Sequence, residues 1–449
     1  MENARSAALR ALLRVELDKG YSNLVLDHAL KSTPLNGPDR ALATVLFYGV
    51  LERRITLDYY IGCFSKIPMK KMSPKTREIL RIGVYQLLFL EKIPAPAAVN
   101  ECVELAKKNG EMRSSGFINA VLRSLLRKLD ELPQPDHDKE PLRYLSVKYS
   151  CPEWLISLWR EAYGESVAVC LLESLTEKPD VFIRVNNTLV TEEQLVERLA
   201  GENIHAERVG WPSGALRLKN PGEIGRSSCY GEGLFHVQDL SSQICCTLLN
   251  PQEGESVLDV CAAPGGKTFT LAELMNGRGR VTAFDKYEGK VKLIREGAER
   301  LRLSSVSASV RDAAKPDADP EPADKVLCDV PCSGLGVLRR KPEIRYKLAP
   351  ALDSLPDLQY LILCRTSELV KKGGTLFYST CTLNPRENSG VARRFLSEHA
   401  DFEPLALSLP GQEARAIAEP VNEWTLMPYA NGTDGFFLAA FCRKKQGSG

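Results

Sequence analysis

The chain has 449 residues, 44% hydrophobic and 26% charged, a composition typical of a globular protein with two to three domains. Its longest uncharged apolar run, 41–51, is too short to cross a bilayer, and its first residues resemble no signal peptide, so we expect a cytoplasmic protein without a membrane partner. The thirteen cysteines form no Cys-x-x-Cys pair and the five histidines do not cluster with them, which argues against a disulfide framework and a metal site.

Residues 1–131 are predicted to form an all-helical domain. Ser73 and Pro74 are typical of a helix start, and the apolar residues after them predict a central helix. Residues 117–126 carry a further apolar stripe. The net charge of the chain is +2, yet residues 1–130 contain 21 Lys and Arg against 13 Asp and Glu, an excess of +8. This excess favours an anionic partner, although a solvated helical surface would give the same composition.

Two basic clusters in this domain are candidate contacts for RNA. One comprises Arg123, Arg127 and Lys128, and the other Lys66, Lys70, Lys71, Lys75 and Arg77. No aromatic residues alternate with either cluster, so we expect contact with phosphates rather than stacking on bases. The alternative is that both clusters only solubilise the domain.

Residues 132–141 read as a linker, because they are polar, hold three prolines and have no periodicity. A small α/β module is predicted over 142–229. Its elements are helices over 153–163, 165–175 and 191–199 and strands over 181–185, 206–209 and 215–218. The third helix carries a capping box formed by Thr191 and Gln194.

The last domain, 230–445, is predicted to be a Rossmann-like α/β sheet that starts near Phe235. Apolar runs predict strands over 257–260, 280–284, 306–310, 325–328, 375–379 and 435–442. Helical spacing predicts helices over 291–301 and 354–371, the second stopped by Gly373 and Gly374. The first strand leads through Pro264, Gly265 and Gly266 into a helix for which Thr268 is the expected N-cap. Strand, glycine turn and helix together are typical of a nucleotide-binding sheet.

Acidic residues follow four of these strands: Asp259, Asp285, Asp312 and Asp329. Ligands of such sheets bind at the carboxyl ends of the strands, which favours these acids as ligand contacts over ordinary helix caps. The glycine turn lacks the spacing of a Walker loop and of a dinucleotide fingerprint. We therefore expect a nucleoside bound through its sugar and base.

Three motifs resemble the signature motifs of the RNA cytosine-5 methyltransferases: Cys261-Ala-Ala-Pro-Gly-Gly-Lys-Thr, Asp329-Val-Pro-Cys-Ser-Gly-Leu-Gly and Tyr378-Ser-Thr-Cys-Thr. Gln238-Asp-Leu-Ser-Ser-Gln and Asp434-Gly-Phe-Phe agree with the same family. The resemblance covers 230–442 closely. The helical front resembles one branch, the bacterial Sun/Fmu-type methyltransferases of 16S ribosomal RNA, which begin with an RNA-binding domain like the NusB antitermination factor.

The resemblance implies S-adenosylmethionine as the cofactor. It places Asp285 on the cofactor's ribose, Asp312 on the adenine amino group and Asp329 beside the methionine end and the cytosine edge. The cofactor would also lie against Cys261, Ala262, Ala263, Pro264, Gly265, Gly266 and Lys267. For Lys267 the alternative is an ion pair with one of the acids. The family also implies that the final strand pairs antiparallel inside the sheet.

Two cysteines compete for the role of nucleophile. Cytosine C5 becomes nucleophilic only after a thiolate has added to C6, so the reaction needs one reactive cysteine. The residues alone do not separate Cys332 from Cys381, because thiolate character depends on surroundings that a sequence does not reveal. The resemblance implies that Cys381 attacks and that Cys332 helps to release the product.

The sequence thus predicts a monomeric enzyme that methylates C5 of a cytosine in 16S ribosomal RNA. A transfer RNA methyltransferase with the same chemistry is one alternative. A non-catalytic RNA-binding or antitermination factor is another, against which the two cysteines and the acids at the strand ends argue.

Overall fold

The computed structural model describes residues 3–18, 22–315, 320–347, 349–408 and 421–445. The chain divides into two compact units. The helical unit comprises Met1–Glu177 and Leu338–Leu348, and the sheet unit comprises Lys178–Val337 and Ala349–Gly449. None of the described helices combines the length and the apolar character that crossing a bilayer requires.

The helical unit consists of ten α-helices within its described residues. They are α1 (Ala4–Asp18), α2 (Ser22–Lys31), α3 (Gly37–Glu52), α4 (Arg54–Phe64), α5 (Pro74–Phe89), α6 (Ala95–Lys108), α7 (Ser115–Leu126), α8 (Pro141–Tyr149), α9 (Glu153–Tyr163) and α10 (Glu165–Ser174). The predicted start of α5 is confirmed, because the Ser73 hydroxyl accepts a hydrogen bond from the Thr76 amide and Pro74 occupies the first turn. Helix α8 was not predicted.

Helix α5 is central, as its apolar pattern predicts. It packs against α1, α3, α4, α6 and α7, and Ile79, Leu80 and Ile82 are fully buried. The neighbouring helices approach closely: a Cβ on Gly49 would lie 1.9 Å from the Tyr85 ring, and one on Gly83 2.7 Å from Leu122. The predicted stripe on α7 is confirmed, since its inward residues are buried in the same core.

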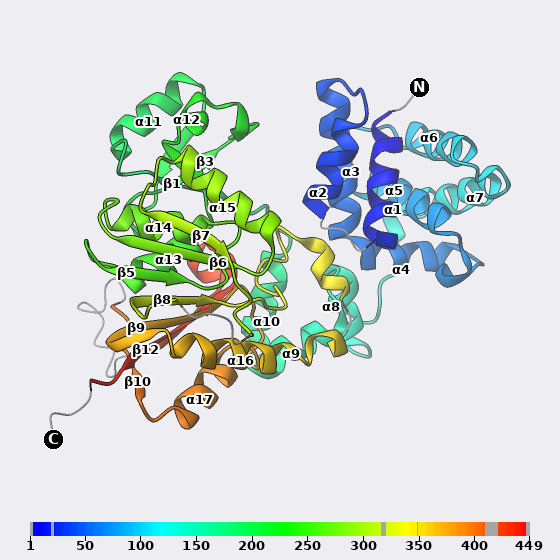
Figure 1. Ribbon diagram of the computed structural model, residues 1–449. Helices are drawn as coiled ribbons and strands as arrows, with labels where there is room; N and C mark the ends of the chain where they lie inside the picture. Colours follow the sequence, from blue (N-terminus) through cyan, green and yellow to red (C-terminus); the bar gives the residue numbers. More distant parts are fainter. Residues whose placement is uncertain (1–2, 19–21, 316–319, 348, 409–420, 446–449) are drawn as a thin grey trace. The chain divides into compact units, whose positions relative to one another are not determined.

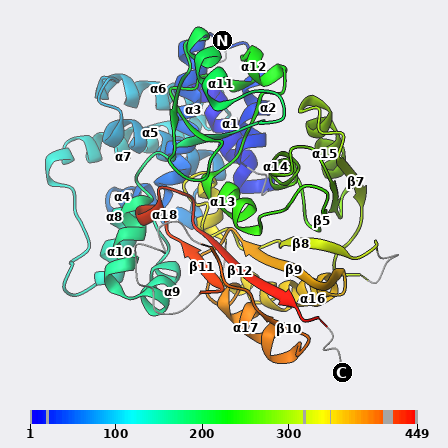
Figure 2. The same ribbon diagram turned by 90° about the vertical axis from the view of Figure 1, so that its left-hand side faces the viewer.

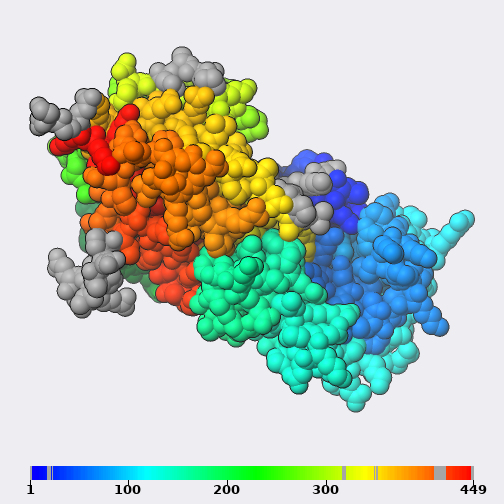
Figure 3. Space-filling model, turned by 90° about the horizontal axis from the view of Figure 1, so that it is seen from below, coloured from blue at the N-terminus to red at the C-terminus, as the bar shows by residue number. Residues whose placement is uncertain are grey.

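The segment Leu338–Leu348 belongs to the helical unit, although it follows the Cys332 motif in the sequence. Arg345, 1% exposed, donates hydrogen bonds to the backbone carbonyls of Glu52 at 3.1 Å and Ser150 at 3.5 Å. The Tyr346 hydroxyl donates to the carbonyl of Leu51. Figure 3 shows α8–α10, in cyan to green, continuing into the blue helices of the same unit. The sequence did not predict this segment's place in the fold.

A four-stranded antiparallel sheet opens the sheet unit. Its order is β2-β3-β1-β4, formed by β1 (Val181–Val185), β2 (His205–Arg208), β3 (Ala215–Lys219) and β4 (Phe235–Val237), with helices α11 (Glu192–Gly201) and α12 (Ser228–Gly231). The predicted capping box of α11 is present. The expectation that the larger sheet starts near Phe235 is wrong, because β4 pairs with β1.

The larger sheet has the order β10-β12-β9-β8-β5-β6-β7, and β11 pairs with β12. The strands are β5 (Ser256–Asp259), β6 (Arg280–Asp285), β7 (Val306–Val310), β8 (Ala323–Asp329), β9 (Val370–Thr380), β10 (Phe402–Pro404), β11 (Glu423–Leu426) and β12 (Phe436–Arg443). Strands β5 to β9 are parallel. The predicted final strand is confirmed: β12 lies antiparallel between β9 and β10, beside β9 in Figure 2.

Helices cover both faces of this sheet (Figure 1). Alternation along the strands divides the core: Val257 and Leu327 face one cluster, whereas Leu258 and Val326 face the other. The first cluster is closed by α13 (Leu240–Leu249), α14 (Gly266–Leu274) and α15 (Glu288–Arg300), the second by α16 (Leu355–Ser367) and α17 (Ser389–Glu398). A short helix, α18 (Pro428–Asn431), precedes β12.

Two predicted helix ends are wrong. Helix α14 begins at Gly266 with Gly265 as N-cap, because Gly265 adopts a φ of +111° and turns the chain earlier. Thr268 lies inside the helix, where its hydroxyl donates to Asp259 at 2.7 Å. Helix α16 ends at Ser367 rather than near residue 371, because Val370 already pairs with Ala323 and starts β9.

Candidate active site

A cavity of about 160 Å³ lies at the carboxyl ends of β5 and β8. Most of the predicted cofactor-binding residues line it. The lining is Val237, Gln238, Ser242, Asp259, Cys261, Ala262, Ala263, Pro264, Gly266, Lys267 and Asp329. The structure therefore brings the first signature motif and the acid at the end of β8 to one site, as the order of parallel strands predicts.

Backbone hydrogen bonds shape the turn that forms one wall. The Ala262 amide donates to the carbonyl of Phe284 in β6 and the Gly265 amide to that of Ala262, both at 2.8 Å. A Cβ on Gly265 would lie 2.4 Å from the Phe269 ring. The turn thus requires glycine both for its positive φ and for its close contact with α14.

Two buried polar groups of the lining lack a partner on one atom each. Asp259 is 1% exposed and its Oδ1 has no hydrogen bond, and the Nε2 atom of Gln238 is likewise buried and unpaired. Burial raises the pKa of Asp259 to about 7. Buried polar atoms without partners are unusual in folded proteins, so these two atoms point to a bound polar ligand.

Lys267 and Asp329 form an ion pair in the lining. The Lys267 Nζ lies 2.7 Å from the Asp329 Oδ2, and the Ser379 hydroxyl donates to Oδ1 at 2.7 Å. Burial disfavours the ammonium form of Lys267, but its attraction to Asp329 outweighs burial, so the pKa of Lys267 is raised. The ion-pair interpretation of Lys267 is therefore observed, and both carboxylate oxygens of Asp329 are held in place.

The other two predicted acids lie on the same edge of the sheet but outside the cavity lining. Asp285 ends β6 and accepts a hydrogen bond from the Tyr287 amide at 3.1 Å, with Lys290 3.7 Å away. Asp312 follows β7 and pairs with Lys286 at 3.1 Å. Within the described residues no group of His, Cys, Asp or Glu is arranged to hold a metal ion.

The two competing cysteines lie side by side. Cys332 follows β8 and Cys381 follows β9, and because these strands are parallel neighbours their following segments meet. The two sulfur atoms are 3.2 Å apart, and both side chains are partly exposed. The hydrogen bond to Cys381, and then burial, raise the pKa of Cys332 well above its usual value. Cys332 is therefore held as a thiol against the sulfur of Cys381.

Glu387 fixes both cysteine segments and was not predicted. It is fully buried, and its Oε2 accepts hydrogen bonds from the Ser333 amide at 2.8 Å and from the Gln359 amide group at 2.9 Å. Asn384 donates to the other oxygen at 2.8 Å. A single Glu in a polar loop carries no pattern that distinguishes it from a surface residue, so the sequence held no signal for it.

The Asp434-Gly motif is explained by a close backbone contact. The Gly435 amide donates to the carbonyl of Gly336 at 2.9 Å, and the Gly336 amide donates to that of Cys381 at 3.0 Å. A Cβ on Gly336 would lie 1.9 Å from the Gly435 carbonyl oxygen. Both glycines are needed for the Cys332 segment to reach the start of β12.

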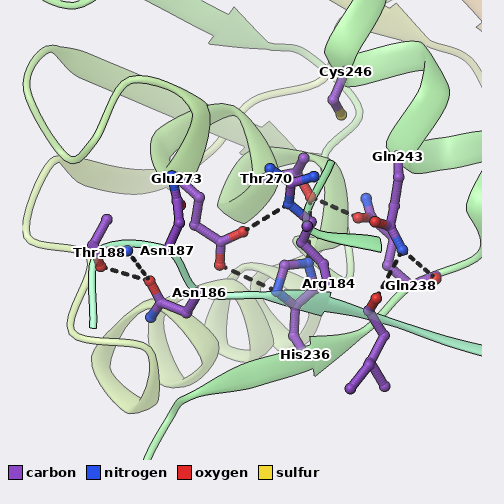
Figure 4. A network of polar contacts seen from close by, with 12 residues as sticks. Arg184, Asn186, Asn187, Thr188, His236, Gln238, Gln243, Cys246, Thr270 and Glu273 are labelled. Carbon is purple, nitrogen blue, oxygen red and sulfur yellow. Dashed lines mark hydrogen bonds and ion pairs between the residues drawn. The ribbon is translucent and has the colours of Figure 1, made fainter. Parts of the chain in front are cut away.

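A buried charged network joins the small sheet to α14 (Figure 4). Arg184 of β1 lies 3.6 Å from the Glu273 carboxylate, and His236 of β4 lies 3.3 Å from its other oxygen. All three residues are at most 3% exposed. The Thr270 hydroxyl donates to the Gln238 side chain at 2.6 Å. The small sheet thus holds α14, the helix that begins at the glycine turn.

Several residues of the two basic clusters have partners within the helical unit. Arg77 donates to the Glu16 carboxylate and to the carbonyl of Met72 at 3.2 Å, so it stabilises the unit itself. Lys75 donates to the carbonyl of Asn109 at 3.0 Å. Arg123 donates to Asn119 at 2.9 Å but remains exposed. Contact with RNA stays a prediction for both clusters.

Three family models match consecutive parts of the chain. Residues 246–442 match the model described as 16S rRNA methyltransferase RsmB/F, and residues 2–127 match the NusB family. Residues 151–225 match the ferredoxin-like domain of RsmF/B-like methyltransferases. The predicted fold class, a helical NusB-like domain and a small module before a Rossmann-like domain, is thereby confirmed.

Relatives match over nearly the full length. The probable ribosomal RNA small subunit methyltransferase B of Bacillus subtilis is 40% identical over 98% of this chain and 99% of its own. The corresponding protein of Synechocystis is 37% identical over 98% and 99%. The crystal structure of PH0851 superimposes with a TM-score of 0.82 at 29% identity over 98% of each chain.

Proposed function

The chain belongs to the RsmB/F family of RNA methyltransferases, and from this premise we propose that it methylates C5 of a cytosine in 16S ribosomal RNA with S-adenosylmethionine. The observation that carries the proposal is the cysteine pair, with sulfur atoms 3.2 Å apart, beside the Lys267–Asp329 pair. Covalent catalysis at C6 needs a nucleophile and an assisting group at one place, and this pair supplies both.

The residues of the cavity fit the methionine end of S-adenosylmethionine. That end carries an ammonium and a sulfonium cation, and Asp259 and Asp329 give the lining its carboxylates. The unpaired atoms of Asp259 and Gln238 offer an acceptor and a donor. Since pockets for whole ligands of this class have roughly 300–1,000 Å³, the cavity of about 160 Å³ would hold only part of the cofactor.

The nucleoside part would extend along the strand ends. Asp285, at the end of β6, would accept hydrogen bonds from the ribose hydroxyls, and Asp312 from the adenine amino group. Lys290 and Lys286, their present partners, are about half exposed and would have to move aside. When bound, the cofactor supplies the methyl group that C5 receives.

We assign the nucleophile to Cys381. Its thiolate adds to C6 of the cytosine, which turns C4–C5 into an electron-rich enamine and makes C5 nucleophilic. After C5 has gained the methyl group, a base must take its proton, and the electrons of that C–H bond form the C5–C6 double bond as the Cys381 thiolate leaves C6. Cys332, whose raised pKa keeps it as a thiol, lies beside the departing sulfur and assists its release.

Asp329 would orient the cytosine edge. Lys267 and Ser379 fix both of its oxygens, so the carboxylate has one position relative to the cysteine segments. The cytosine must leave its stack to reach these groups. Residues 1–131 would hold the surrounding RNA, residues 142–229 would link them to the catalytic domain, and residues 230–445 would carry the reaction.

A methyl-transfer assay tests the proposal. The protein is incubated with labelled S-adenosylmethionine and with protein-free 16S ribosomal RNA, assembled small subunits or transfer RNA, and the product is mapped by bisulfite sequencing. We expect one protected cytosine in 16S ribosomal RNA. Protection only in transfer RNA would favour the alternative substrate, and binding of RNA without any methyl transfer would favour a non-catalytic role.

A further inference from the structure

A second cavity lies wholly within the helical unit, whereas the cysteine pair belongs to the sheet unit. It has about 270 Å³ and is formed by residues 53–60, 88–89, 132–135 and 144–148. The last two ranges come from the predicted linker and from α8, and 2–127 is the part that matches the NusB family. The pocket is therefore built jointly by the NusB-like helices and the chain that follows them.

Three aromatic rings and two cations are among the residues that line this pocket. Phe89 stands at its rim with 38% of its surface exposed, whereas Tyr60 is 8% exposed and forms part of the floor. Tyr144 forms another wall, with the Lys148 ammonium 5.8 Å from its ring centre. The Thr56 hydroxyl donates to the carbonyl of Val147 at 2.6 Å and holds α4 against α8. The pocket is thus preformed.

Arg53 is the cation in the pocket without a polar partner. Its guanidinium lies 5.4 Å from the centre of the Phe89 ring, and its side chain makes no hydrogen bond or ion pair within the part of the chain that the structure describes. Burial, and then repulsion from Arg345, lower the pKa of Arg53. A half-buried guanidinium with five donors and no acceptor is set up to receive an anion.

We propose that this pocket binds one unpaired nucleotide of the RNA, with its base stacked against Phe89 and Tyr144 and its phosphate on Arg53. The proposal rests on the proposed RNA substrate and deepens it. Stacking on an aromatic face tolerates every base, and arginine beside the ring adds a phosphate contact. The helical unit would then hold RNA by a flipped-out or single-stranded nucleotide, not by phosphate contacts alone.

The sequence predicts phosphate contact rather than stacking for the two basic clusters, and the pocket proposed here lies outside both of them. Phe89, Tyr60 and Tyr144 are far apart in sequence and meet only through the packing of α4, α5 and α8. The excess of basic over acidic residues in 1–130 favours an anionic ligand, such as a nucleotide, over a neutral or cationic one.

The test measures binding of the full-length protein to two labelled single-stranded oligoribonucleotides of equal length, one with bases and one fully abasic, by fluorescence anisotropy. The variants are Phe89→Leu, which removes the ring, and Phe89→Tyr, which keeps it. For one stacked base the wild type should prefer the base-bearing oligomer by about 5- to 150-fold. This preference should fall by that factor in Phe89→Leu and persist in Phe89→Tyr.

A charge variant tests the phosphate contact. Arg53→Gln should weaken binding of both oligomers and reduce the slope of log affinity against log salt by about 1. Lys108→Gln, on the exposed end of α6 outside the pocket, is the control and should leave both unchanged. Thermal unfolding of each variant verifies that it remains folded.

An unchanged preference for bases in Phe89→Leu would overturn the proposal, as would equal effects of Arg53→Gln and Lys108→Gln. If neither pocket variant affects either oligomer, the pocket takes another ligand, such as a peptide. None of these measurements uses methyl transfer. A protein that shows the Phe89 dependence yet transfers no methyl group would contradict the proposed function and leave this inference standing.

Discussion

The ammonium group of Lys267 lies 2.7 Å from the carboxylate of Asp329, and both side chains are less than one-quarter exposed. Removing one member of such a pair leaves the other charge without a partner. We expect Lys267→Met to lower the free energy of unfolding by about 1.5–3 kcal/mol, measured by urea denaturation.

A second pair on the same strand gives a matched control. Lys371 lies 2.9 Å from Asp324, at the opposite end of β8, but the two side chains are 47% and 33% exposed. Surface pairs contribute about 0–1 kcal/mol, so Lys371→Met should have a small effect that salt reduces further. Equal losses for the two variants would contradict a special role for the buried pair.

The stability of the sheet unit should depend on the protonation of Asp259. Burial raises its pKa to about 7, whereas an Asp carboxyl in the unfolded chain has a pKa of about 3.9. Between these values the folded protein keeps a proton that the unfolded chain has lost, so this contribution to stability is lost as the pH rises through 7. Asp259→Asn should remove this pH dependence, which urea unfolding between pH 4 and 8 would detect.

Asp324 is a control, because its pKa is shifted in the opposite direction from that of Asp259. Burial alone would raise its pKa, but hydrogen bonds from Ser256 and the charge of Lys371 outweigh burial and lower it to about 2. Its contribution is therefore present above the pKa of the unfolded carboxyl and lost as the pH falls toward 2. Parallel stability curves for the wild type and Asp259→Asn would show that Asp259 does not titrate as stated.

Asp285→Ala should weaken binding of S-adenosylmethionine by about 10- to 150-fold, because two ribose hydroxyls would lose a charged acceptor worth about 1.5–3 kcal/mol. Isothermal titration calorimetry measures this directly. Glu296→Ala, on the exposed side of α15, is the control, since Glu296 forms an exposed ion pair with Lys292 at 3.7 Å. An unchanged affinity in Asp285→Ala would remove Asp285 from the cofactor site.

Arg345→Met should destabilise the helical unit by about 1.5–3 kcal/mol, because the carbonyls of Glu52 and Ser150 would lose a charged donor in a buried place. Lys347→Met, two residues further and exposed, should change stability by less than about 0.5 kcal/mol. Denaturation monitored by far-ultraviolet circular dichroism compares the two. Equal stability of both variants would contradict the structural role of Arg345.

The segment Leu338–Leu348 belongs to the helical unit, so deleting the N-terminal helices would remove its contacts. A chain that lacks residues 1–140 would leave Arg345 without Glu52 and Tyr346 without Leu51. Because Leu338 follows Cys332 by only a few residues, the loss of these contacts would reach the Cys332 segment through the chain itself. Point variants of the helical unit are therefore the better test of its contribution to RNA affinity.

The periodicity of apolar residues predicted most of the helices and strands. The alternation of Val257 with Leu258 specifies the two faces of β5, and the Ser73-Pro74 start specifies α5, because both depend on local spacing. Helix ends were less predictable: Thr268 is a good N-cap by type, but the positive φ of Gly265 starts the helix earlier. The place of Leu338–Leu348 depends on contacts with residues nearly 300 positions away, which no local pattern encodes.

In the candidate site, too, some residues could be predicted from the sequence and others could not. The motifs predicted which residues meet, since Cys261, Lys267 and Asp329 line one cavity. They did not reveal the residues that hold the site, such as Glu387 behind the cysteines and the Arg184–Glu273–His236 network. Those residues act through burial and partners far apart in sequence, which only the folded chain brings together.

Trapping of a covalent protein–RNA adduct distinguishes the roles proposed for Cys381 and Cys332. Cys332→Ser and Cys381→Ser are each incubated with S-adenosylmethionine and 16S ribosomal RNA and separated by denaturing electrophoresis. If Cys381 attacks C6 and Cys332 assists release, Cys332→Ser accumulates an adduct that survives denaturation and Cys381→Ser forms none. An adduct with Cys381→Ser and none with Cys332→Ser would contradict the account, because Cys332 would then be the nucleophile.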